Sequence, residues 1–218
     1  MAIKKALVIG GGIGGLCSAI ALRQKGIDVD LIEKSEANHV WGIGIIHQTN
    51  AVRAEAMLGV ADEVLKQGWG FSGGRIHNKA GHMIQEIAAP PAKEGALPGD
   101  MGITRPRLAK ILQDRAETLG TKITFSTTCK VTKNGPDGAE VKFSNGETAE
   151  YDLVVGADGI YSDLRDELWG KQFGAKFAGQ GGWRCNIPRL PEVEQVWLFL
   201  TDKGNCGLMP LADDLMYI

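Results

Sequence analysis

The sequence predicts an α/β fold, and three features carry that prediction. A short apolar run, Ala6–Ile9, ends in a glycine-rich turn and leads into apolar residues at helical spacing. Residues 129–151 form strand-like segments separated by turn residues, and longer strand-like runs follow Phe177. The 218 residues, 44% of them hydrophobic and 23% charged, are enough for one sizeable core or two small ones.

The N-terminal elements predict a Rossmann-like βαβ unit. Ala6–Ile9 is continuously apolar, as is typical of a strand buried on both faces. The helical spacing that follows ends near Gly26, which stands where a C-terminal cap belongs. A second strand, Val29–Ile32, then runs into Glu33.

Helices and strands alternate through the rest of the chain. Residues 50–65 predict one or two helices with a break near Gly59, residues 75–84 predict a hairpin, and the proline-containing residues 88–99 predict a surface loop. An amphipathic helix is predicted between Pro106 and Gly120.

Strands dominate the C-terminal half of the sequence. An antiparallel meander and a further buried strand are predicted at Cys129–Lys133, Glu140–Phe143, Thr148–Tyr151 and Leu153–Val155. The start of a β-rich region is predicted at Trp183–Ile187, Val196–Leu200 and Cys206–Met209.

Composition narrows the class of partner and the compartment. With 24 Lys and Arg against 26 Asp and Glu, and no basic block, the net charge of −2 argues against nucleic acid as a partner. The N-terminal apolar run is too short for a signal peptide or a membrane span, so we expect a cytoplasmic protein without membrane contact. The four cysteines are scattered and have no C-x-x-C spacing, so no metal site is predicted.

A glycine fingerprint lies between the first strand and the first helix. Gly10 permits a tight turn, Gly12 lets the backbone approach a pyrophosphate, and Gly15 lets helix and sheet pack closely. Glu33, at the end of the second strand, can accept ribose hydroxyls and would repel a 2′-phosphate. The predicted dinucleotide contacts are Gly10, Gly12, Ile13, Gly14, Gly15, Glu33 and Lys34. This pattern alone leaves FAD and NAD open.

A second motif distinguishes the two cofactors. Gly156-Ala157-Asp158-Gly159, with Asp152–Val155 before it and Ser162–Arg165 after it, resembles the Asp-Gly motif of the flavoprotein aromatic hydroxylases. These single-component FAD monooxygenases are typified by p-hydroxybenzoate and salicylate hydroxylases. The resemblance implies that Asp158 and Gly159 lie at the FAD pyrophosphate and ribose and that Asp158 takes part in NAD(P)H handling. The plain alternative is a turn that follows a strand.

Two shorter stretches agree with the resemblance. Gly42–Ile45 looks like the family's segment beside the flavin ring, which implies a cofactor contact for Gly44. Ile103–Arg105 looks like the segment whose arginine contacts FAD, which implies that role for Arg105. The alternative for Arg105 is a solvated residue at a helix start.

Three residues are candidates for catalysis or substrate binding. His47 follows the flavin-side stretch and could act as a base for a phenolic substrate. Arg184 and Tyr217 fall in predicted strands over the substrate cavity, where Arg184 could clamp a carboxylate. Packing in the core or exposure at the surface is the alternative for each of them.

The activity that the resemblance implies is an FAD-dependent monooxygenase that consumes NAD(P)H and O2 and hydroxylates a small aromatic or heteroaromatic substrate. The cofactor carries the redox chemistry, while the protein supplies position and a dry pocket. Two alternatives stay open: an FAD-linked reductase or dehydrogenase without oxygen insertion, and a truncated, non-catalytic flavin-binding fragment.

The resemblance also divides the chain. Residues 1–75 and 100–175 are predicted to form a discontinuous FAD-binding domain, and residues 76–99 and 176–218 part of a β-rich substrate domain. Family members continue for a comparable length, with a second Gly-Asp motif and C-terminal helices, whereas this sequence ends within an apolar run. We therefore expect these residues alone to bind FAD weakly, to form homo-oligomers and to hydroxylate little.

Overall fold

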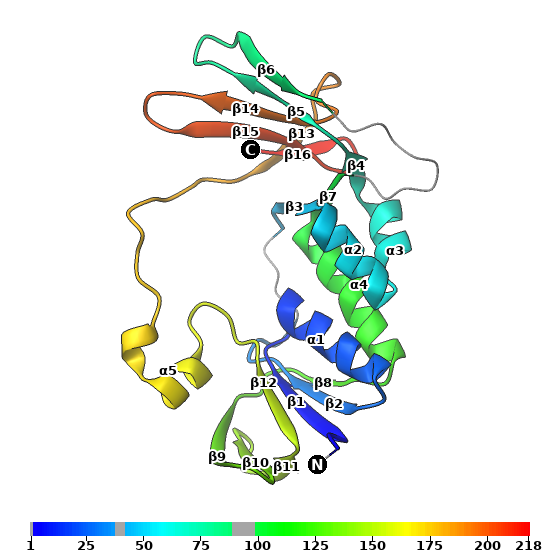
Figure 1. The fold of residues 1–218 in the computed structure, drawn as a ribbon, viewed down its shortest axis with the longest axis vertical. Helices are drawn as coiled ribbons and strands as arrows, with labels where there is room; N and C mark the ends of the chain where they lie inside the picture. Colours follow the sequence, from blue (N-terminus) through cyan, green and yellow to red (C-terminus); the bar gives the residue numbers. More distant parts are fainter. Residues whose placement is uncertain (1, 38–41, 89–98) are drawn as a thin grey trace. The chain divides into compact units, whose positions relative to one another are not determined.

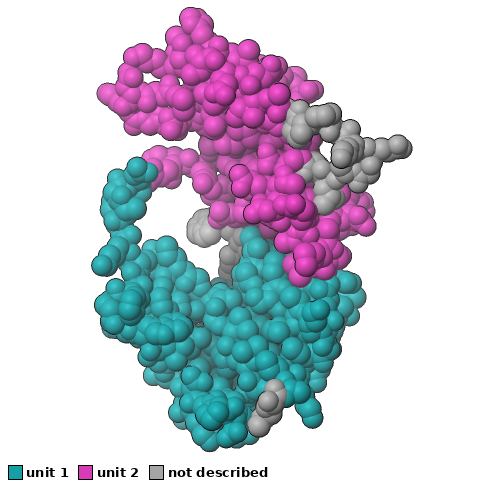
Figure 2. Space-filling view, viewed as in Figure 1, with its two compact units in different colours: residues 1–40, 109–180 teal, residues 41–108, 181–218 magenta. Residues whose placement is uncertain are grey.

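A computed structural model describes residues 2–37, 42–88 and 99–218 (Figure 1). The chain forms two compact units, coloured separately in Figure 2: unit 1 contains residues 1–40 and 109–180, and unit 2 contains residues 41–108 and 181–218. Within the described ranges, no helix is long and apolar enough to cross a membrane.

A four-stranded parallel sheet, in the order β12-β1-β2-β8, lies at the centre of unit 1. Its strands are β1 (Lys5–Ile9), β2 (Asp28–Ile32), β8 (Lys122–Thr124) and β12 (Leu153–Gly156), and α1 (Ile13–Gln24) connects β1 to β2. Leu7 and Val8 are fully buried, as expected for a strand covered on both faces. The predicted βαβ unit is therefore confirmed.

The predicted meander is also confirmed and packs on this sheet. It consists of the antiparallel strands β9 (Cys129–Gly135), β10 (Gly138–Phe143) and β11 (Thr148–Tyr151). Val141 and Tyr151 share a buried cluster with Leu7 and Ile32, so the meander covers part of the parallel sheet. Two short helices follow β12, namely α5 (Asp163–Trp169) and the 3-10 helix η1 (Lys171–Phe173).

Unit 2 contains a six-stranded sheet in the order β13-β16-β15-β14-β5-β6 (Figure 1). Its strands are β5 (Gly74–His77), β6 (Met83–Ile87), β13 (Asn186–Pro188), β14 (Val196–Leu200), β15 (Asn205–Pro210) and β16 (Leu215–Tyr217). The hairpin of β5 and β6 was predicted, as were β14 and β15. β14 pairs with β5 in parallel, which joins the two halves of unit 2 in one sheet.

A three-stranded sheet and helices complete unit 2. The strands are β3 (Gly44–Gln48), β4 (Trp69–Phe71) and β7 (Asp100–Thr104), and the helices are α2 (Thr49–Leu58), α3 (Ala61–Gln67) and the start of α4 (Arg105–Thr118). The predicted break at Gly59 is confirmed, because this residue takes a left-handed φ of +73° between α2 and α3. The predicted amphipathic helix is α4, in which Leu108, Leu112 and Ala116 are buried.

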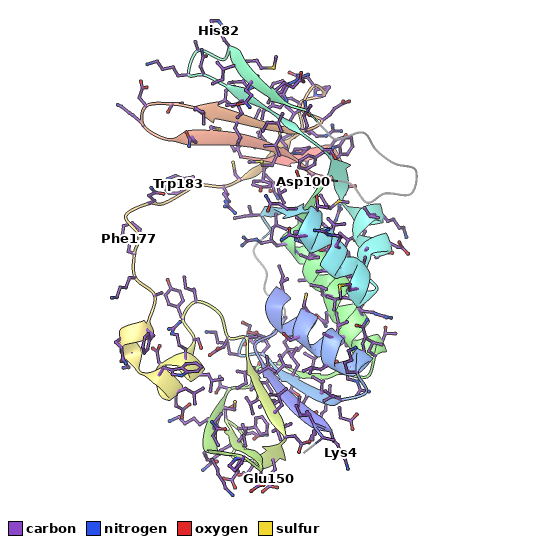
Figure 3. The ribbon with its side chains drawn as sticks, viewed as in Figure 1. Lys4, His82, Asp100, Glu150, Phe177 and Trp183 are labelled. Carbon is purple, nitrogen blue, oxygen red and sulfur yellow. The ribbon has the colours of Figure 1, made fainter. Side chains whose placement is uncertain are left out.

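One predicted strand is wrong over most of its length. Trp183–Ile187 was expected to be a strand, but β13 begins only at Asn186, where it pairs with Tyr217 of β16. Trp183 is 99% exposed and lies on an extended segment outside the strands (Figure 3). A strand needs a partner, and the β16 ladder reaches no further than Asn186. Residues 89–98 of the predicted surface loop lie outside the described residues.

The compact units divide the chain at different points from the predicted domains. Residues 42–75 and 100–108 pack in unit 2, whereas the predicted FAD-binding domain includes them. The units reflect packing within the protein and not the position of a cofactor. The predicted division therefore stays a prediction about which residues surround FAD.

Candidate functional site

The fingerprint glycines join β1 to α1 in unit 1, and packing requires two of them. Gly10 has a φ of +108°, and a Cβ at this position would lie 2.4 Å from the carbonyl oxygen of Ala157. A Cβ at Gly15 would lie 1.8 Å from the carbonyl oxygen of Gly10. These two positions therefore exclude any side chain, because the turn, the helix and β12 approach too closely.

Gly12 is different, because nothing in the protein occupies the space beside it. It is the N-cap of α1, and a Cβ there would meet no atom within 4 Å. The first turn of α1 contains no acidic side chain and receives no side-chain cap. Its backbone N–H groups, including those of Ile13 and Gly14, therefore remain available to an anion at the positive end of the helix dipole.

The carboxylate of Glu33 is held against this turn by backbone donors. One carboxylate oxygen accepts a hydrogen bond from the N–H of Gly11 at 2.7 Å, and the other accepts one from the N–H of Ser35 at 2.9 Å. Partial burial raises the pKa of Glu33, but the hydrogen bonds from Ser35 and Gly11 outweigh it and the pKa is lowered. Glu33 is therefore ionised at neutral pH, and each oxygen keeps a lone pair for a ligand hydroxyl.

A cavity of about 240 Å³ in unit 1 brings the two predicted motifs together. The predicted residues that line it are Gly10, Gly12, Glu33, Lys34, Asp158 and Gly159. Lining residues that the prediction missed include Thr127, Thr128, Cys129, Tyr161, Leu164 and Glu167. Most of these lie in the connections β8–β9 and β12–α5, where only tertiary contacts identify them.

The cavity has an acidic lining. Among the described residues that line it, Lys34 is the only cation, whereas Glu33, Asp158, Asp163 and Glu167 are acidic. Burial raises the pKa of the Cys129 thiol to about 11, with the nearby charges of Glu167 and Asp158 adding to the effect. The cavity therefore favours a nucleoside whose sugar has free hydroxyls over one with an additional phosphate.

Asp158 faces this cavity and also organises the start of α5. One of its oxygens accepts a hydrogen bond from the Ser162 hydroxyl at 2.6 Å, and the other accepts one from the N–H of Leu164 at 3.2 Å. Ser162 is the N-cap of α5 and accepts from the N–H of Arg165 at 2.9 Å. Gly159 has a φ of +84°, so the turn after Asp158 favours glycine.

Four other predicted residues come together in unit 2. Gly44 lies against Tyr217, since a Cβ at Gly44 would be 2.2 Å from Cδ1 of the tyrosine ring. Burial raises the pKa of Tyr217, and the charges of Arg184 and Arg105 oppose this effect. Nε of Arg105 is buried and has no hydrogen-bond partner within the described part of the chain, which makes it available to an acceptor.

His47 lies away from this cluster. It is 7% exposed on β3, and its Nδ1 contacts a carboxylate oxygen of Glu55 in α2, which is 5% exposed. Its neighbours Ile46 and Gln48 line a separate cavity of about 500 Å³. Since side chains alternate along a strand, His47 points to the opposite side of β3. This geometry gives the role of catalytic base no support, and that role stays a prediction.

The cavity in unit 2 lies against one face of the six-stranded sheet. The sheet lines it with Ile76, Ile87, Val196, Leu198, Met209 and Tyr217. The opposite wall is more polar and includes Gln48, Thr49, Ser72 and Asp100. An apolar wall with a few polar groups is typical of a small-molecule site.

Fold and site together define a dinucleotide-binding α/β protein, because a phosphate-binding turn, a ribose-facing carboxylate and the β12–α5 loop border one cavity. Comparison with known proteins then identifies the family. Residues 4–211 match the family model for the FAD binding domain, and the chain belongs to this family of flavoprotein aromatic hydroxylases.

Individual relatives agree with this assignment. The aurachin C monooxygenase/isomerase of Stigmatella aurantiaca is 36% identical over 222 residues, which cover 97% of this chain and 55% of the relative. The tetrameric form of 2-methyl-3-hydroxypyridine-5-carboxylic acid oxygenase has a TM-score of 0.77 at 28% identity, over 100% of this chain and 58% of that one. Klebsiella pneumoniae HpxO complexed with FAD has a TM-score of 0.78 at 26% identity, over 98% and 56%. The chain thus spans little more than half the length of these relatives.

Proposed function

We propose that this protein is an FAD-dependent monooxygenase that consumes NAD(P)H and O2 and hydroxylates a small aromatic or heteroaromatic substrate. The observation that carries the proposal is the cavity of unit 1, in which the open backbone at Gly12, the carboxylate of Glu33 and the Asp158–Gly159 loop border one space. The reaction balances when one oxygen atom enters the ring, the other leaves as water, and NAD(P)H supplies two electrons.

The residues of unit 1 fit the adenosine diphosphate half of FAD. The N-terminus of α1, at Gly12 to Gly15, would hold the pyrophosphate, since it offers unpaired donors and carries no carboxylate of its own. Glu33 would accept hydrogen bonds from the ribose hydroxyls. FAD, when bound, supplies the electron transfer from NAD(P)H and the activation of O2.

The residues of unit 2 fit the flavin and the substrate. Arg105 has a buried donor without a described partner, which a flavin oxygen would satisfy, and Gly44 offers backbone without a side chain. Tyr217 and Arg184 would bind the substrate at the end of the cavity that Tyr217 lines. On this proposal, residues of both units contribute to the FAD-binding domain, as the division at 1–75 and 100–175 requires.

Titration of the purified chain with FAD tests the cofactor. We expect saturable quenching of flavin fluorescence, and absence of saturation would contradict the proposal. Self-association is a separate proposal, supported by the tetrameric form of one relative, and size-exclusion chromatography measures it.

Oxygen labelling tests the reaction. Aromatic acids, phenols and N-heterocycles are screened for stimulated NAD(P)H oxidation, and any product formed under 18O2 is analysed by mass spectrometry. We expect one 18O atom in the product. Substrate oxidation without label would instead identify a reductase or dehydrogenase.

A further inference from the structure

Two layers of unit 2 touch at one end and separate at the other. At the touching end, a Cβ at Gly44 would overlap the ring of Tyr217, and a Cβ at Gly102 would lie 2.0 Å from the carbonyl oxygen of Pro210. At the other end of the same β3–β7 ladder, Gln48 and Asp100 line the cavity of about 500 Å³. Glycines therefore bring the layers together, and the cavity opens where side chains return.

Gln48 and Asp100 face this cavity as a pair. They lie directly opposite each other in the antiparallel β3–β7 ladder, so their side chains leave the same face. The next pair in the ladder, His47 and Met101, is buried on the other face. Figure 3 labels Asp100 at the start of β7.

Neither side chain has a hydrogen-bond partner within residues 2–37, 42–88 and 99–218, although their neighbours do. Thr49 donates to the carbonyl of Gly99, and Ser72 accepts from the N–H of Gly99 at 3.0 Å. Arg75, the cation nearest in the cavity lining, pairs with Glu86 at 3.4 Å and lies over the ring of Trp197. Asp100 is therefore an unpaired carboxylate, and burial raises its pKa.

An unpaired carboxylate beside an amide is a recognition element for a ligand with matching groups. Asp100, when ionised, can only accept hydrogen bonds, whereas the Gln48 amide can donate one to a carbonyl. The apolar sheet wall opposite them suits the face of a planar ring. A ring with an N–H next to a C=O satisfies all three surfaces, whereas a carboxylate placed at this end would meet the charge of Asp100.

We propose that Asp100 and Gln48 determine substrate specificity, and that the substrate is a lactam-type N-heterocycle whose N–H donates to Asp100 and whose carbonyl accepts from Gln48. This inference rests on the proposed function, because it assigns the cavity of unit 2 to the substrate. It also gives the ring an orientation, with its donor end at Asp100 and its acceptor end toward Tyr217.

A pair of probes tests the inference on the purified chain. 2(1H)-Quinolone carries the N–H and carbonyl, and its N-methyl derivative lacks the donor. Calorimetry should show that the wild-type chain binds the first at least about tenfold more tightly, because methylation leaves a charged acceptor unpaired. In Asp100→Leu the two affinities should agree within about twofold, since the acceptor has been removed.

Asp137→Ala is the control, because it removes a negative charge from an exposed turn of unit 1; it should keep the wild-type preference. No binding of either probe to the wild type, equal binding of both, or a preference that persists in Asp100→Leu would each overturn the inference. FAD titration of the same samples keeps the proposals apart. A chain that binds FAD but shows no probe preference contradicts only the specificity pair, whereas a chain that does not bind FAD contradicts the proposed function.

Discussion

Glu33 accepts a hydrogen bond from the backbone N–H of Gly11 at 2.7 Å, which ties the end of β2 to the glycine turn after β1. The folded state lowers the pKa of this carboxyl below its usual 4.5. Its ionised form therefore stabilises the fold at pH values above 4.5, and this contribution is lost as the pH falls through the lower folded pKa.

Glu33→Gln should accordingly lower the free energy of unfolding at pH 7 by about 1 kcal/mol, because an amide oxygen replaces a charged acceptor. Urea unfolding at a series of pH values measures this. The difference between wild type and variant should shrink on acidification below pH 4.5. A difference that stays constant with pH would show that the hydrogen bonds do not depend on the charge.

Gly12 and Gly15 should respond differently to alanine. Gly12→Ala meets no protein atom, so we expect unchanged stability and at least about tenfold weaker FAD binding, since the methyl group blocks the pyrophosphate. Gly15→Ala forces a Cβ onto the carbonyl of Gly10 and should cost about 3 kcal/mol of stability. Thermal unfolding and flavin titration measure both. Equal FAD affinity in Gly12→Ala and wild type would refute the assignment of the turn.

Asp158→Ala should impair flavin binding or reduction by NAD(P)H and leave the fold largely intact. Because Asp158 also bonds Ser162 and Leu164, loss of its cofactor contact must be separated from loosening of α5. Ser162→Ala is the matched control, since it removes the cap of α5, at about 1 kcal/mol, without changing Asp158 itself. Circular dichroism and flavin titration compare the two variants. If Ser162→Ala loses as much flavin affinity as Asp158→Ala, Asp158 acts through the helix.

The contact of His47 with Glu55 predicts a structural role. His47→Leu leaves the Glu55 carboxylate buried at 5% exposure, so we expect a loss of about 3 kcal/mol in stability. The double variant His47→Leu/Glu55→Leu should recover most of it, because no charge remains uncompensated. Urea unfolding measures both. A single variant as stable as wild type, with altered pH dependence of turnover, would instead favour the role of base.

Asp100 should cost stability when ionised, because burial raises its pKa above the ordinary 3.8. The folded state therefore binds more protons than the unfolded state near and above this value, and stability falls as the pH rises through that window. Asp100→Asn should remove this dependence and raise the free energy of unfolding at pH 7 by less than about 1 kcal/mol. Urea unfolding at pH 4 and pH 7 provides the comparison, and a variant less stable than wild type at pH 7 would contradict it.

The accuracy of the sequence predictions follows the range of the interactions involved. The βαβ unit, the break at Gly59 and the meander were predicted because apolar periodicity, glycine and turn clusters are local signals. The strands β3, β4, β7 and β8 were not predicted. Three of them hold buried positions within short or glycine-containing segments, which give no clear alternation. Trp183 has strand-forming character but no partner strand.

The sequence by itself determined the fold class, the cofactor motif and the family, because spacing of glycines and acids between local elements is sufficient for these. Only the tertiary structure decided that Asp158 also holds Ser162, that His47 meets Glu55, and that Asp100 lies opposite Gln48. The last pair depends on strand register between segments 52 residues apart, as the numbers 48 and 100 give. No local pattern records such a register, because it is set by the packing of whole layers against one another.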